Sequence, residues 1–129
     1  MSNPLGAQWT AAGFTETSSI SRTDSVVLHG SGMPATLPVL SLQMSAAGSG
    51  VPFGDGILCV GGSLIRLRTK INVGAAAQFP EPGDTSLSRV SGAASGSGTL
   101  YSYQAYYRDT ESFCSSATFN LTNAVRSVW

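Results

Sequence analysis

The chain has 129 residues, with seven basic and seven acidic side chains, and its residues are 42% hydrophobic but only 11% charged. This length fits one domain with one core, and the apolar content excludes a fully disordered chain. A formal net charge of zero leaves no surplus of Lys and Arg for phosphates, so a basic nucleic-acid binder is excluded. We expect one domain over residues 1–129, with residues 1–19 as a candidate irregular or partner-binding amino-terminal arm.

The first half of the chain contains four segments with strand patterns. Three are short and bounded by Gly, Pro or Ser, which favour turns, and they cover 25–29, 38–44 and 56–60. The fourth, 64–73, has the strongest period, because Ile65, Leu67, Thr69, Ile71 and Val73 alternate with polar or charged residues. A period of two predicts a strand with one buried and one solvated face.

The second half combines poor helix signals with two further strands. Proline and 15 glycines leave room only for single helical turns, near 82–88 or 109–113. The Gly- and Ser-rich residues 91–98 fit a long hairpin connection. Segment 99–108 carries tyrosines on both sides, which predicts a central strand, and 119–129 is expected to be the closing strand.

These strands and turns together predict the fold class. Six or more short strands separated by turn clusters are typical of an all-β protein. We expect an antiparallel β-sandwich, Ig-like or jelly-roll-like, with short connecting turns.

Catalytic and metal-binding patterns are scarce in this sequence. His29 is the only imidazole, and no G-x-S-x-G elbow holds a nucleophile. One enzymatic interpretation stays open, a small hydrolase in which His29 works with Asp24 or Ser25. Neither a zinc-protease motif nor a calcium loop occurs, and the glycines around 54–62 precede a strand rather than a helix. We therefore expect no metal and no cofactor.

The two cysteines, Cys59 and Cys114, would enclose 55 residues if they were joined. A bond closing such a loop contributes about 4 kcal/mol in the loop-entropy model. Two buried free thiols are the alternative. Asn120 opens a formal glycosylation sequon, but its place in a predicted strand argues against occupancy.

Three short motifs resemble an uncharacterised family of bacterial domains, found alone or at the carboxyl end of long, secreted, repeat-rich proteins. They are C-V-G-G at 59–62, Y-R-D at 107–109 and F-N-L-T at 119–122, and the terminal Trp129 agrees with them. The resemblance covers about residues 20–129. It implies export and a β-sandwich, and it brings no activity with it.

Within that frame, four charged residues near turn motifs are candidate structural ion partners: Arg66, Arg108, Asp55 and Asp109. Four aromatic residues are candidates for stacking on sugar rings: Trp9, Tyr101, Tyr106 and Trp129.

The expected function is a non-catalytic structural, assembly or adhesive module, secreted or at the cell surface. A homo-oligomer paired through edge strands is a candidate assembly, because a chain of zero net charge has little repulsion to oppose contacts. A glycan or a surface protein is the other candidate partner, and a carbohydrate-binding module is the main alternative function. Nucleic acid is not an expected partner. Membrane insertion is not expected either, since no apolar run is long enough to span a bilayer.

Overall fold

The computed structural model describes residues 7–12, 25–34, 38–54, 56–92, 97–109 and 118–129. Over these residues the chain forms eight strands and one short helix. In chain order they are β1 (Gln8–Ala12), β2 (Val27–Ser31), β3 (Pro38–Phe53), β4 (Gly56–Ile71), β5 (Ala77–Phe79), α1 (Leu87–Ser91), β6 (Leu100–Arg108), β7 (Phe119–Leu121) and β8 (Val125–Val128).

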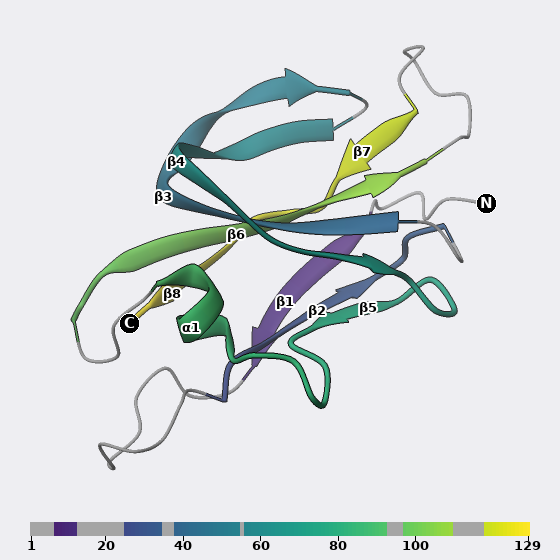
Figure 1. Cartoon of the computed structure of the whole chain (residues 1–129). Coiled ribbons are helices and arrows are strands. Elements are labelled where there is room, and N and C mark those ends of the chain that lie inside the picture. The colour runs from purple at the N-terminus through teal and green to yellow at the C-terminus, as the bar shows by residue number, and fades with distance from the viewer. Residues whose placement is uncertain (1–6, 13–24, 35–37, 55, 93–96, 110–117) are drawn as a thin grey trace.

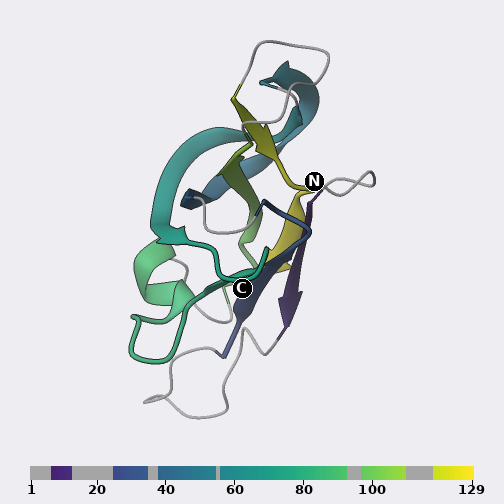
Figure 2. The ribbon, with the colours of Figure 1, turned by 90° about the vertical axis from the view of Figure 1, so that its right-hand side faces the viewer.

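The strands form two antiparallel sheets that pack together, which confirms the predicted all-β sandwich (Figures 1 and 2). One sheet has the order β1-β2-β5, and the other has the order β4-β3-β6-β7 with β8 also paired to β6. Strand β6 is central, as its tyrosines predicted, because β3 lies on one side of it and β7 and β8 on the other.

The core lies between the sheets and receives side chains from both. Leu28 and Phe79 come from the three-stranded sheet, while Tyr103 and Tyr107 come from β6, and all four are nearly inaccessible to solvent. Trp129 is also buried, at 1% exposure, and its indole Nε1 donates a hydrogen bond to the Tyr103 hydroxyl at 2.8 Å. A buried indole N–H normally needs such a partner.

The β3–β4 hairpin is longer than the sequence predicted. Segment 38–44 continues to Phe53, and the predicted strands 56–60 and 64–73 form one strand that ends at Ile71. The register between β3 and β4 shifts at three places, so the hairpin is irregular along its length. In Figure 1, the part of the hairpin next to the turn between β3 and β4 bends away from the rest of the two strands and extends toward β7.

The predicted alternation of β4 holds in its middle but not at its end. Ile65 packs against the core and Leu67 is buried, as expected. Ile71 and Val73 are instead 56% and 81% exposed, whereas Asn72 is buried and donates a hydrogen bond to the Pro34 carbonyl. The prediction of an inward face up to Val73 is wrong from Thr69 onward, since Thr69 is already exposed within β4, and after Ile71 the chain turns, with a bridge between Val73 and Ala76.

Two further elements differ from the sequence expectation. Residues 81–84 form a β-turn, closed by the Asp84 N–H bond to the Glu81 carbonyl at 2.9 Å, so only the last two residues of the predicted helical turn near 82–88 are helical, at the start of α1. The expected closing strand is divided into β7 and β8, since three residues, 122–124, oppose two on β6. Most of the other predicted helical turn, 109–113, lies outside the described residues.

The sequence predicts an irregular or partner-binding arm over residues 1–19. In the structure, part of this segment forms β1. This strand pairs with β2 from Gln8 to Ala12, so that part of residues 1–19 belongs to a sheet. Residues 1–6 and 13–19 lie outside the described residues.

Candidate functional site

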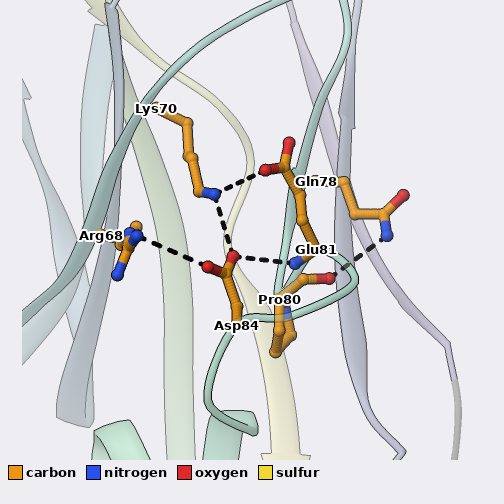
Figure 3. A network of polar contacts seen from close by, with 6 residues as sticks. All are labelled: Arg68, Lys70, Gln78, Pro80, Glu81 and Asp84. Atoms are coloured by element: carbon orange, nitrogen blue, oxygen red, sulfur yellow. Dashed lines mark hydrogen bonds and ion pairs between the residues drawn. The ribbon is translucent and has the colours of Figure 1, made fainter.

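The charged residues that the structure brings together join the two sheets (Figure 3). Lys70 on β4 places its Nζ 2.5 Å from Glu81 Oε2 and 3.0 Å from Asp84 Oδ2. Arg68, also on β4, lies 3.5 Å from Asp84 Oδ1. Both carboxylates belong to the turn that follows β5 in the other sheet. We call these four residues the Lys70 network.

Turn chemistry fixes the acidic half of the Lys70 network. Pro82 and Gly83 occupy the two central positions of the turn, where a proline and a glycine are favoured. The Asp84 carboxylate accepts the Glu81 backbone N–H at 3.0 Å, so it is held in place before Lys70 reaches it. Gln78 supports the same turn, because its amide donates to the Pro80 carbonyl at 3.2 Å.

Electrostatics in the network follow from these contacts. The hydrogen bond from the Glu81 backbone, then the one from Lys70, lower the pKa of Asp84 below its usual value of 3.8. Hydrogen bonds to Glu81 and Asp84 raise the pKa of Lys70 above its usual 10.5. Two cations and two carboxylates balance, so the network offers a charged ligand no net attraction.

Two open grooves lie on either side of Gln78 and Glu81, which line both of them. The first, of about 250 Å³, has a polar side formed by His29, Lys70 and Gln78 and an apolar side formed by Ile71 and Val73. The second, of about 370 Å³, lies against Val27, Pro80 and Pro82. Their mixed lining fits a small polar ligand better than a purely apolar one.

His29 occupies an exposed position on β2, opposite Thr10 on β1 and Gln78 on β5. Among the described residues, no carboxylate or hydroxyl hydrogen-bonds its imidazole. Ser25 lines the other groove, and Asp24 lies outside the described residues. The described residues therefore do not assemble the acid, base and nucleophile that a serine-hydrolase mechanism requires.

A second polar centre, which the sequence did not reveal, is the buried side chain of Gln104 on β6. Its Oε1 accepts the Cys59 backbone N–H at 3.1 Å, and its Nε2 donates to the carbonyls of Ile57 at 2.8 Å and Thr122 at 2.6 Å. The amide thus connects β4 with the segment between β7 and β8, where no strand pairing joins them. We call this connection the Gln104 seam.

The seam is completed by the irregular segment after β7. The Thr122 hydroxyl accepts the Ala105 backbone N–H at 3.0 Å, and the Thr122 N–H donates to the Ala105 carbonyl at 3.0 Å. The Thr122 side chain therefore replaces one strand-pairing hydrogen bond that is lost where three residues, 122–124, face two residues on β6. Thr122 is 3% exposed, so its hydroxyl is committed to this contact inside the protein.

Aromatic and glycine residues pack the hairpin end against β7. The ring of Phe119 lies 5.1 Å from that of Phe53 and 4.9 Å from that of Tyr106. Gly54, at a φ of 63°, has no room for a side chain, since a Cβ there would overlap the Phe119 ring. A Cβ at Gly56 would meet Asn120 and Leu121. Only glycines let the turn approach β7 this closely.

Of the four candidate sugar-stacking residues, Trp129 is buried, while Tyr101 and Tyr106 are partly exposed. Trp129 is buried in the core and Tyr101 packs against it, while the Tyr106 ring stacks on Phe119. The prediction that Trp129 stacks on a sugar is wrong, because its indole is buried in the core and a ligand cannot reach it. Trp9 lies on β1, but its side chain is outside the description.

Among the described residues, no ion pair joins Arg66 or Arg108 to Asp109. Arg66 is exposed, and Arg108 donates a hydrogen bond to the Thr118 hydroxyl at 3.0 Å. Neither arginine forms an ion pair with a described carboxylate. Asp109 is fully buried, with its backbone N–H bonded to the Thr118 carbonyl, and Asp55 lies outside the described residues. The expected role of pinning loops to the sheet is performed by the Lys70 network instead.

Cys59 is a free thiol on β4, and its Sγ donates to the Ile57 carbonyl at 3.5 Å. The structure therefore does not support the predicted disulfide between Cys59 and Cys114, and Cys114 itself lies outside the described residues. Within the described ranges, no three His, Cys, Asp or Glu side chains gather closely enough to hold a metal ion. The part of the chain that the structure describes contains no helix long and apolar enough to cross a membrane.

No family model, curated protein or solved structure matches this chain. The resemblance to secreted bacterial domains therefore stays a prediction, and the functional argument depends on the described residues.

Proposed function

We propose that this chain is a non-catalytic structural or adhesive module that acts outside the cell by contacting other protein surfaces. The observation that carries the proposal is the placement of exposed large apolar side chains. Among the residues whose burial the structure describes, six of the eight such side chains lie on the β3–β4 hairpin or just after it, at Val51, Phe53, Ile57, Leu64, Ile71 and Val73. Soluble monomers scatter such residues singly, and their concentration on one element is typical of a contact surface.

Charge distribution along the hairpin supports the same interpretation. Residues 38–65 contain a single charged residue, Asp55. Charged residues are depleted in the centre of protein interfaces, because each one must lose its hydration when the partner docks. A stretch of this length with a single charged residue is therefore suited to contact with protein.

The polar centres support a scaffold role. The Lys70 network joins one sheet to the turn after β5, and the Gln104 seam joins the hairpin to the segment after β7. In both cases the polar side chains are engaged in holding elements together. A module that presents a surface needs such fixed elements beneath it.

Site-specific photo-crosslinking in cells that express the intact gene tests this function. A photoreactive residue at position 57 should give protein adducts that can be recovered by protease treatment of the cell surface or from the medium. The matched control is position 89, because Arg89 is exposed but lies on α1, away from the hairpin end that carries position 57 (Figure 1). A chain retained wholly inside the cell, or adducts no more abundant at position 57 than at position 89, would contradict the proposal.

Carbohydrate binding is a second candidate function, now supported by the grooves rather than by aromatic rings. Gln78 and Glu81 line both grooves, and Ile71 and Val73 offer apolar contact to the CH faces of a sugar. A glycan array with the purified chain and with Gln78→Ala tests it. Binding that the substitution abolishes would support this function, and no binding to any glycan would eliminate it.

A further inference from the structure

The first of the two grooves combines polar and apolar residues. His29 lies between two buried residues of β2, so its side chain points to the outer face of the three-stranded sheet. Gln78 lies directly opposite it on β5, and such cross-strand partners point to the same face. Ile71 and Val73 line the same groove, at 56% and 81% exposure, while Asn72 between them is buried. We call this the His29 groove.

A tight turn holds the apolar side of the His29 groove in place. Val73 and Ala76 exchange two backbone hydrogen bonds, at 2.9 and 3.1 Å, and both residues line the groove. Between them, Gly74 and Ala75 have φ values of 57° and 65°, as in the two-residue turns that fit twisted strands. The Ala75 carbonyl also accepts the Met33 N–H at 3.2 Å. These bonds fix the backbone under Val73, so a ligand that covers its side chain orders little additional chain.

The charged residues of the His29 groove are already paired. Lys70 Nζ lies 2.5 Å from Glu81 Oε2 and 3.0 Å from Asp84 Oδ2 (Figure 3). An ionic ligand would have to displace one of these contacts, so the pairing favours a neutral ligand. The Glu81 side chain is still 46% exposed, so its carboxylate can also accept a hydrogen bond from a hydroxyl.

We propose that the His29 groove binds one pyranose ring of a neutral glycan. This inference rests on the second candidate function, carbohydrate binding, and assigns it to one groove and one class of sugar. Ring hydroxyls hydrogen-bond to His29, Gln78 and Glu81, whose side chains include both donors and acceptors. The CH face of the ring covers Ile71 and Val73. A sugar carries both kinds of surface on one neutral ring, which is the combination that this mixed lining requires.

The size of the His29 groove limits the ligand to one ring. Its volume is about 250 Å³, below the roughly 300 to 1,000 Å³ of pockets that take drug-sized ligands. The described residues that line it include no Trp, Tyr or Phe, so ring stacking does not strengthen the contact. We therefore expect weak binding, with a Kd on the order of a few mM for a single sugar.

Backbone amide NMR of the full chain, titrated with single sugars, tests the proposal. The probes are the methyl glycosides of glucose, galactose and mannose, each up to about 100 mM and thus well above the expected Kd. At least one of them should give saturable shifts at amides that line the groove, those of Gly30, Val73, Ala76 and Gln78. The uronate of the sugar that binds should bind at least about threefold more weakly, because it brings a charge that the paired groove does not compensate.

Two substitutions at residues that line this groove but not the other give a matched comparison. His29→Ala removes a hydrogen-bonding side chain and Val73→Ser removes apolar contact, and each should raise the Kd at least about threefold. Both side chains are exposed, so the fold should be retained, as unchanged amide shifts away from the groove will show. Ser25→Ala is the control, because Ser25 lines only the second groove, and it should leave the Kd unchanged.

The outcomes separate this inference from carbohydrate binding itself. Gln78 lines both grooves, so a glycan array with Gln78→Ala does not distinguish them. Array binding without shifts at the His29 groove, or a Kd that His29→Ala and Val73→Ser leave unchanged, would overturn the groove and keep the carbohydrate function. Equal affinity for the uronate would overturn the restriction to neutral sugars. If neither the array nor the titration shows binding, the inference and the carbohydrate function both fail.

Discussion

Replacing Gln104 by methionine removes the Gln104 seam while keeping the volume of the side chain. The substitution deletes three hydrogen bonds, at 3.1, 2.8 and 2.6 Å, from a side chain with no solvent exposure. Each such bond contributes about 0.5 to 1.5 kcal/mol net, so Gln104→Met should lower the free energy of unfolding by about 3 kcal/mol. No cavity adds to the loss, because methionine and glutamine are similar in size.

Urea unfolding at neutral pH, followed by tryptophan fluorescence, measures this loss. The control is Gln78→Met, which removes one hydrogen bond, to the Pro80 carbonyl, from a half-buried glutamine. We expect that control to cost less than about 1 kcal/mol.

Amide hydrogen exchange supplies a local measurement of the same substitution. The Cys59 N–H should lose protection in Gln104→Met, because that amide donates to the Gln104 side chain. A global loss no larger than that of the control, or an unchanged exchange rate at Cys59, would refute the assignment of the seam.

Three further predictions concern the Lys70 network, the core and the hairpin turn. The pKa of Asp84 is lowered by its backbone hydrogen bond and by Lys70, so stability should be full above pH 3.8 and decline as pH falls through the lower folded-state value. Asp84→Asn should flatten that acid decline, as urea midpoints across the acid range will show. Trp129→Phe should cost about 2 kcal/mol, from a lost indole hydrogen bond and a partial cavity, and a thermal melt measures it. Gly54→Ala should cost at least about 2 kcal/mol, whereas Gly74→Ala, with positive φ but open space, should cost about 1 kcal/mol in the same assay.

The fold class could be predicted because the alternation of apolar and polar residues is a local signal. Ile65 and Leu67 on β4, and Tyr103 and Tyr107 on β6, face the core as their spacing indicates. The same signal fails at Val73, where it extends into a turn and loses its meaning. The sequence also predicts two strands where the structure has the single strand β4. The reason is that Gly61 and Gly62 lie inside β4, although glycine is typical of turns.

The site was harder to predict because its contacts join residues far apart in the chain. Lys70 is expected on a solvated strand face, and nothing local shows that the Glu81 turn will reach it. Gln104 shows the same limit, since its partners lie 45 to 47 residues earlier and 18 residues later. The sequence does show that residues 38–65 are nearly free of charge. It could not show which apolar side chains of the hairpin are exposed to solvent.

The Gln104 seam also determines how the domain would respond to mechanical load. A pull on the hairpin end is transmitted to the rest of the molecule partly through one amide side chain, whose two hydrogen bonds to β4 and one to Thr122 can break one after another. Strands paired over many residues, such as β3 with β6, share a shear force across several bonds at once. The hairpin end should therefore detach at low force while the sandwich stays intact, so the chain would lengthen under load without unfolding.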